Sequence, residues 1–537
     1  MKKVERILIV LIFFLSALKG LAQDVVEAMS HEKREGFIQK ASELRASGNY
    51  TEAGTMLDSI LVKNPEDAPI LLFKGDLMLQ ANNFQKAIET YSKLLPLGFE
   101  PTTVRINLSY ALFMNHKPGP ALVEAKGAWE GEPTAKNAVV NYFNALLWNT
   151  KTREAGEFLE SQKDLLDSAD VLVLKARLES TSGNYMEGLV YYDSLCHSFP
   201  NKHYVKEYSD VLLAKGQAEK AILVFENNNG LFSEKELNAF NSKIKNREKV
   251  SAGTRFSLFN DIGGNVRHSG EFWFQLPEAK TYQLRGSAGR SNLSSIYGGN
   301  VQTNFVHGQL KENWGRGITG ETDIHFLQIK PGTGASYGGL TGRQSFKYQR
   351  HDRRMLSLFY SKDVLNFTPS LYEQNITSAN LGYITHIMTG AKTGIYSQGS
   401  RGSYSDDNKK VEVFASLYHL FSMFPVFKTG LNYSYLHFSQ QKELYFSPDR
   451  YSNSEIFADL SGNLPVKFPL KLAVQGGFGF QQIEENKPES ATRYQAELST
   501  SFKSLVASLK YQTSNVAAGT GSGYKFNWFT LNLAYSW

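Results

Sequence analysis

Aromatic side chains gather in one short polar segment of this chain, "YFSPDRY" at residues 445–451. The ring faces of Tyr445, Phe446 and Tyr451 can stack on the C–H edges of sugar rings, and tyrosine hydroxyls can hydrogen-bond sugar hydroxyls. Tyr372 lies in a second polar segment of similar character. These four aromatics are therefore candidates for lining the path of a sugar polymer, and the alternative is an aromatic girdle at a membrane interface.

The other residues of the segment could support the same chemistry. Pro448 stiffens the chain, and the side chains of Asp449 and Arg450 can hydrogen-bond hydroxyl groups or pair with a surrounding wall. A conducting path must bind its substrate weakly enough to release it. We therefore expect the loop that carries "YFSPDRY" to fold toward a lumen and line a sugar path.

A lumen requires a wall, and the last strand of the chain suggests its form. Apolar residues alternate with small or polar ones in "FNWFTLNLAYSW", and the apolar set is Phe529, Leu531, Leu533, Tyr535 and Trp537. In a closed membrane barrel such a strand turns one face to lipid and the other to the lumen, and it must pair with the first strand to remove a sheet edge. The terminal aromatic residue is also the type of signal that barrel-insertion machinery recognises.

The sequence from residue 251 onward predicts the rest of that barrel. Alternating segments rich in Tyr, Phe, Thr and Gly indicate about 16 antiparallel strands, with an uncertainty of two, over 251–537. Short connections alternate with longer polar ones, including residues 290–300, 363–375, 400–410 and 439–453. This asymmetry is typical of outer-membrane barrels, whose turns face the periplasm and whose loops face outside.

The first half of the chain predicts a helical repeat array over residues 30–230. A small residue recurs at steps of 33 or 34, at Ala53, Ala87, Ala121, Ala155, Gly188 and Ala221. This period is the tetratricopeptide signature, and about six repeats suffice for a superhelix with a concave face. Tyr50, Phe84 and Tyr185 precede the small residue and should plug the turn between helices. The array is expected to bind a periplasmic or inner-membrane protein, and the alternative is a spacer.

Two flanking segments complete the expected organisation. Residues 1–22 have a basic start at Lys2 and Lys3, an apolar stretch at Ile7–Leu18 and small residues before a cleavage site, which indicates a secretory signal peptide. Residues 231–250 should form a polar capping helix and a linker. The fold expected is thus an α-helical solenoid followed by a β-barrel, in the outer membrane of a Gram-negative bacterium with the repeats in the periplasm.

Composition excludes several other classes of protein. A net charge of +6 over 537 residues is too small to indicate nucleic-acid binding. A mean hydropathy of −0.33 excludes a bundle of transmembrane helices. The single cysteine, Cys196, excludes a disulfide framework. His307, His325 and His351 lie on different expected strands without metal-ligand spacing, so we expect no metal and no cofactor.

The whole architecture resembles the exopolysaccharide-export porins, such as the outer-membrane component of bacterial cellulose synthase and the poly-N-acetylglucosamine porin. Within this group it is most similar to the YaiO-type outer-membrane barrel family. The local sign is the "YFSP" of residues 445–448, which is similar to an element near the end of the cellulose-export barrel. The resemblance implies export of a polysaccharide through the barrel.

Two features depart from this group. The polymer exporters carry many more repeats, and their barrel for a cationic polymer has an acidic lumen. From residue 251 onward this chain has 28 Lys and Arg against 20 Asp and Glu, which argues against a cationic substrate.

The sequence leaves one expected function and two alternatives. We expect a polysaccharide-exporting barrel that contacts outer-membrane lipid and the barrel-assembly machinery and binds a protein through its repeats. The alternatives are a non-transporting scaffold or surface receptor, and an enzyme such as an acyl hydrolase, which would need a serine, a histidine and a carboxylate to converge. The expected function is non-enzymatic, with no catalytic residue.

Overall fold

The computed structural model describes residues 30–245, 249–277, 281–315, 317–351, 353–390, 392–423, 425–466, 468–517 and 525–537. The signal peptide expected at residues 1–22 lies outside the described residues. The chain forms two compact units, and the division between them falls between Leu174 and Lys175. None of the helices in the described ranges is both long enough and apolar enough to cross a membrane.

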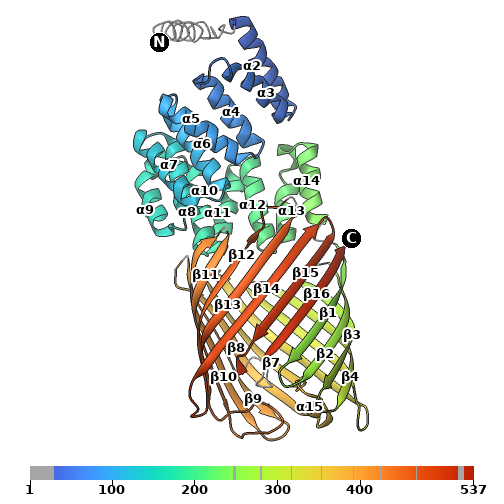
Figure 1. Cartoon of the computed structure of the whole chain (residues 1–537). Helices are drawn as coiled ribbons and strands as arrows, with labels where there is room; N and C mark the ends of the chain where they lie inside the picture. The colour runs from blue at the N-terminus through green and yellow to red at the C-terminus, as the bar shows by residue number, and fades with distance from the viewer. Residues whose placement is uncertain are drawn as a thin grey trace, which may run out of the picture. The chain divides into compact units, whose positions relative to one another are not determined.

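The helical region is an array of tetratricopeptide type, in agreement with the period of the small residues (Figure 1). Its helices are α2 (His31–Ala46), α3 (Tyr50–Leu61), α4 (Ala68–Gln80), α5 (Phe84–Leu94), α6 (Pro101–Met114), α7 (Pro118–Gly131), α8 (Lys136–Trp148), α9 (Thr152–Gln162), α10 (Ser168–Ser182), α11 (Tyr185–Ser198), α12 (Lys202–Ala214), α13 (Ala218–Glu226) and α14 (Glu234–Lys245). The boundary between the two compact units falls inside α10, earlier in the chain than the change from helices to strands.

The recurring small residues occupy the contacts between helices. All six are buried and lie in the first turns of α3, α5, α7, α9, α11 and α13. Gly188 shows why the side chain must be small, because a Cβ added there would lie 2.5 Å from Ser180 Oγ and 3.0 Å from the Ala176 carbonyl oxygen. The close approach of the paired helices therefore selects the residue type that produces the 33- to 34-residue period.

The expected capping helix is α14, which begins after Ser233. The Ser233 backbone N–H donates to Glu236 Oε2 at 3.0 Å, as in a capping box. Phe240 of α14 stacks on Phe225 of α13 with ring centroids 3.8 Å apart. The segment is therefore less polar in its contacts than its composition suggested, and it covers the apolar end of the preceding repeat.

The strands form one closed antiparallel barrel in which each strand pairs with its sequence neighbours and β1 pairs with β16. The strands are β1 (Ser251–Asp261), β2 (Asn265–Gln275), β3 (Tyr282–Ser295), β4 (Asn300–Gly315), β5 (Ile318–Pro331), β6 (Tyr337–His351), β7 (Arg354–Val364), β8 (Thr377–Met388), β9 (Thr393–Tyr404), β10 (Lys409–Met423), β11 (Val426–Phe438), β12 (Tyr451–Asn463), β13 (Leu470–Ile483), β14 (Glu489–Phe502), β15 (Leu505–Ser514) and β16 (Phe526–Ser536). The predicted count of 16 is thus confirmed, and closure leaves no sheet edge unpaired.

The last strand seals the barrel as its pattern predicted. The register of β16 with β1 runs from Ser251 opposite Ser536 to Asp261 opposite Phe526, and the Trp537 N–H donates to the Val250 carbonyl oxygen at 3.1 Å. Side chains on the outside of the last strand are exposed, and they are Phe529, Leu531, Leu533, Tyr535 and Trp537. The same parity around the barrel gives an apolar outer wall and a polar inner wall.

Several strands extend further than the sequence indicated. The segments at 290–300 and 400–410 were expected to be loops, but β3 continues to Ser295 and β10 begins at Lys409. Polar residues there still satisfy their backbone groups by pairing across strands, so polarity alone does not end a strand in a barrel. The connections at 365–376 and 439–450 are long, as expected. We call the rim with these connections the loop rim and the opposite rim the turn rim.

Candidate functional site: the barrel lumen

Three loop-rim connections fold together inside the barrel mouth and form what we call the mouth plug, residues 365–376, 439–450 and 515–517. The first of them contains a short helix, α15 (Pro369–Glu373). Their apolar side chains share one buried cluster with inward-facing strand residues, and its members are Leu365, Leu371, Ile376, Leu436, Phe438, Tyr445, Tyr451, Ala491, Val516 and Ala517. The plug therefore packs against the inner wall and occupies part of the lumen at this rim.

Two of the predicted sugar-path aromatics belong to this buried cluster, Tyr445 from the plug and Tyr451 from the start of β12. Tyr445 donates to Asp406 Oδ2 at 3.0 Å, accepts from Asn408 Nδ2 at 2.9 Å and stacks on Tyr404 at 5.4 Å. Tyr451 is completely buried. The loop does fold inward, but these rings pack against protein. Their faces are not open to a ligand in this conformation, because three loops bury them in a contact that the sequence of one loop cannot reveal.

The other residues of "YFSPDRY" hold the loop in place. Phe446 packs edge-on against Tyr451 with centroids 5.8 Å apart, and the Pro448 carbonyl accepts from the Phe438 N–H at 2.9 Å. The backbone N–H groups of Asp449 and Arg450 both donate to the Glu484 carboxylate. The Asp449 and Arg450 side chains are exposed. These contacts give the segment a structural role in closing the mouth.

Tyr372 lies apart from the other three aromatics. It packs in a second cluster with Leu293, Val301 and Ile329, which face inward from β3, β4 and β5. Its backbone carbonyl accepts a hydrogen bond from the Tyr337 hydroxyl. The loop 365–376 therefore spans the mouth, with Tyr372 against one wall and Leu365 and Leu371 against the other two loops.

Below the plug, the lumen contains a chamber of about 600 Å³. Aromatic rings of Phe259, Phe305 and Trp528 line it beside Arg255 and Glu271. Trp528 is 40% exposed, and its ring meets Phe259 edge-on at 6.0 Å. Aromatic faces beside polar groups that can bind hydroxyls are the composition that suits a carbohydrate.

Charged residues hold the shape of this chamber. Arg255 pairs with Glu271 at 3.2 Å and donates to Asn532 Oδ1 at 3.0 Å. Arg267 donates to the backbone carbonyl of Asn366, which ties the plug loop to the wall. The Arg255 side chain keeps 45% exposure. It can therefore also donate to a ligand in the lumen.

A histidine pair stands on the wall of the same chamber. His307 and His325 lie on neighbouring strands and stack at 4.0 Å, and His307 Nε2 lies 3.1 Å from Asp323 Oδ1. The sequence placed these histidines on different strands but did not reveal that the register brings them together. In the described part of the chain, no cluster of three metal-ligating side chains has the geometry to hold an ion.

A second chamber of about 610 Å³ adjoins the first, since Asp363 and Phe526 line both. Glu455 is buried on its wall, where it accepts from Asn432 Nδ2 at 2.6 Å and pairs with Arg493. Arg343 lies over the face of Phe359, 3.9 Å from its centroid. Positively and negatively charged side chains both line this part of the lumen.

Sequence reasoning missed Phe259, Phe305 and Trp528 as lumen residues. A usable signal was present for Trp528, because strict alternation from Phe529 places it on the opposite face of β16. Phe259 and Phe305 could have been found in the same way from Leu258 and Val306. The grouping of the three rings in one chamber could not have been found from the sequence, because it depends on the register of strands far apart in the chain.

The repeat array offers its own polar network. Glu207 accepts from Arg177 at 2.7 Å and from the Tyr192 hydroxyl at 2.7 Å. Burial would raise the pKa of Glu207, but these partners outweigh it and hold the pKa below its ordinary value. Tyr50, Phe84 and Tyr185 are partly buried at the first positions of α3, α5 and α11. The network through Glu207 thus ties α10, α11 and α12 together.

Comparison with known proteins supports the division into two architectures. Residues 44–101 match the tetratricopeptide repeat. No curated protein matches the sequence. The chain is therefore a tetratricopeptide-repeat region followed by a closed 16-stranded antiparallel β-barrel.

Solved structures resemble each part of the chain. A bacterial polysaccharide outer membrane secretin aligns at 12% identity and a TM-score of 0.45, over 54% of this chain and 99% of its own. Pseudomonas aeruginosa OccK5 aligns at 12% identity and 0.31, over 54% and 97%. A tetratricopeptide repeat protein from Parabacteroides merdae aligns at 18% identity and 0.31, over 40% and 86%. At these TM-scores the likenesses carry no weight for function.

Proposed function

We propose that this protein is an outer-membrane barrel that passes a polysaccharide through a lumen gated by the mouth plug. The outer membrane is favoured by the wall itself, because large apolar side chains such as Phe326 and Leu381 are 61% and 67% exposed on the outside of a closed barrel. Exposed apolar surface on this scale requires a non-aqueous surrounding. The repeats then lie in the periplasm and bind a protein partner of the export apparatus.

The observation that carries the proposal is the chamber lined by Phe259, Phe305 and Trp528. These rings offer stacking faces to a sugar, and Arg255 and Glu271 offer hydrogen bonds to its hydroxyls. The lumen carries paired charges of both signs, and the excess of Lys and Arg over Asp and Glu from residue 251 onward argues against a cationic chain. Weak stacking at several rings allows the chain to move, as conduction requires.

The test removes the chamber rings and compares them with their outward neighbours. Phe305→Ala with Trp528→Ala should lower polysaccharide at the cell surface of the native host and cause the polymer to accumulate in the periplasm. The matched control is Val306→Ala with Phe529→Ala, which removes side chains one position away on the lipid face. Equal surface polysaccharide in both variants and in a full deletion would refute export.

In this proposal, the mouth plug determines whether the barrel conducts at rest. A plug that never opens would instead favour the second candidate, a closed barrel that acts as a surface receptor or scaffold. Tyr445→Ala with Tyr451→Ala should loosen the buried cluster and raise single-channel conductance in planar bilayers. Tyr433→Ala with Tyr494→Ala, which removes two outward tyrosines, should leave conductance unchanged. A plug variant that stays closed would favour the receptor.

We further propose that the protein is not an enzyme, although one trio of residues has the right types. Ser287 lies opposite His307 in the register of β3 and β4, and His307 contacts Asp323. The Ser287 hydroxyl is buried and finds no hydrogen-bond partner among the described residues, so none of them activates it as a base. Serine-directed phosphonate probes should therefore leave the purified protein unlabelled.

A further inference from the structure

A polar patch interrupts the apolar outer wall of the barrel on β2 to β5, near the loop rim. Cross-strand pairing places two adjacent rows at outward positions, one of His268, Asn292, Gln302 and Lys330 and one of Arg290, Asn304 and Gln328. The next row toward the turn rim is entirely apolar and consists of Phe272, Ala288, Val306, Phe326 and Leu340. The change from apolar to polar thus takes place between two adjacent outward rows, which are two residues apart along each strand.

The patch is built as a connected unit. Arg290 Nε donates to Asn304 Oδ1 at 3.0 Å, and Asn304 Nδ2 donates to Gln328 Oε1 at 3.0 Å. This ladder fixes the Arg290 side chain against the wall. Among the described residues, neither Arg290 nor Lys330 has a carboxylate partner within ion-pair distance, and both side chains are exposed. Arg290 and Lys330 are therefore two surface cations to which the described residues offer no counter-charge.

The wider outer wall carries the same sign of charge. Among the described residues at outward strand positions, the one carboxylate is Glu312, at the turn end of β4. Further outward cations lie toward the loop rim at Lys362, Arg401 and Lys409. Acidic residues of the strands otherwise face the lumen. The outer wall at the loop rim is therefore complementary to anions.

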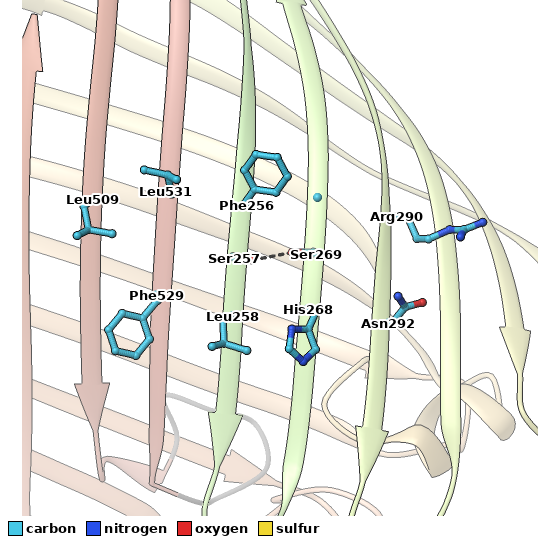
Figure 2. A pocket seen from close by; sticks show the side chains of 11 residues that line it. Phe256, Ser257, Leu258, His268, Ser269, Arg290, Asn292, Leu509, Phe529 and Leu531 are labelled. Atoms are coloured by element: carbon cyan, nitrogen blue, oxygen red, sulfur yellow. Dashed lines mark hydrogen bonds between the residues drawn. The ribbon is translucent and has the colours of Figure 1, made fainter.

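An apolar groove runs into the patch. A depression of about 560 Å³ lies over Gly270, where a missing side chain leaves space beside the ring of Phe256. Figure 2 shows Phe256, Leu531 and Phe529 on one side of this space and Arg290 and Asn292 on the other. An acyl chain in the groove would bring its headgroup to the patch.

A second groove on the outer wall provides a contrast. It has a volume of about 540 Å³ between β9 and β13, and outward side chains of Leu417, Leu431, Ile456 and Phe478 line it. No cation lines this groove among the described residues. It offers contact to acyl chains but nothing that distinguishes one headgroup from another.

We propose that the β2–β5 groove and patch bind a phosphorylated glycolipid of the outer leaflet. An acyl chain fills the space over Gly270, a phosphate pairs with Arg290 and Lys330, and the amides of Asn292, Gln302 and Gln328 bind sugar hydroxyls. The planar guanidinium of Arg290 suits a phosphate geometrically. The inference rests on the proposed outer-membrane location with the loop rim outside, since only that leaflet would meet the patch.

The experiment uses the full chain purified in detergent and follows lipid retention by native mass spectrometry. The probes are diphosphorylated lipid A, zwitterionic phosphatidylcholine and inorganic phosphate. We expect lipid A to be retained in preference to phosphatidylcholine, and phosphate alone not to compete, because the groove contributes to binding. Arg290→Gln with Lys330→Gln should weaken lipid A retention by roughly tenfold, since it removes the charged contacts to phosphate. Arg401→Gln, another outward cation away from the patch, is the matched control.

A second variant tests the groove separately. Gly270→Leu fills the space and should weaken lipid A retention although Arg290 is intact, and Gly308→Leu is its control because that outward position is open. Equal retention of both lipids, or no effect of the Arg290 and Lys330 double variant, would overturn the proposal. A doubled mass without lipid would assign the patch to a second copy. Cell fractionation separately tests the location, so failure of the proposed function can be told from failure of this inference.

Discussion

The helical array and the barrel use apolar side chains in opposite ways. In the array, large apolar side chains such as Leu57 and Tyr91 are completely buried between helices. In the barrel, comparable side chains such as Phe326 and Leu381 are 61% and 67% exposed on the outside, while Glu455 is buried inside. The difference shows that the surrounding solvent, and not the fold, determines which face of an element must be apolar.

The largest effect should come from a charge on the lipid face of the barrel. Leu498→Lys places a cation on the outside of β14, midway between the exposed side chains of Tyr494 and Phe502, and should cost about 2–4 kcal/mol of barrel stability. Urea unfolding in phosphatidylcholine vesicles measures this cost. Ser499→Lys is the control, because its side chain faces the lumen near Glu497 and should be tolerated. Equal costs at both positions would contradict the inverted pattern of the barrel.

An intermediate effect should come from the tight helix contact of the array. Gly188→Ala forces a methyl group against Ser180 and the Ala176 carbonyl and should cost about 1–3 kcal/mol. Thermal unfolding of the full chain, followed by circular dichroism at helical wavelengths, measures the loss. Gly36→Ala in α2 meets no atom within 4 Å and should stabilise the helix by about 0.5–1 kcal/mol. A neutral Gly188→Ala would show that the helices can separate freely.

The smallest effect should be a dependence of the array on pH. The pKa of Glu207 is depressed, because its hydrogen bonds from Arg177 and Tyr192 outweigh burial. The ionised carboxylate therefore stabilises the array fully above the ordinary glutamate pKa of about 4.3, and this contribution is lost as the pH falls through the lower folded value. The helical melting temperature should fall on acidification, and Glu207→Gln should reduce that fall. An unchanged fall in the variant would assign the pH dependence to other groups.

The sequence predicted which types of residue the candidate site contains, but not how those residues are grouped. The sequence placed aromatics in two loop-rim segments and predicted inward folding of one of them, and the structure puts Tyr445 and Tyr451 in the buried cluster that the mouth plug forms with the inner wall. It could not show that Tyr372 would join a different cluster on β3 to β5. The open aromatic faces are those of Phe259, Phe305 and Trp528, because register across the barrel seam brings β1, β4 and β16 around one chamber.

Local periodicity therefore determined the array, the strand count and the lipid-facing set of the last strand. A spacing of two along a strand and of 33 or 34 between repeats is a property of near neighbours, and it can be read without knowing the fold. Tertiary structure alone decided the mouth plug, the His307–His325 stack and the outward patch of Arg290 and Lys330. Each of these joins residues whose proximity is set by barrel closure and strand register, and those depend on all sixteen strands at once.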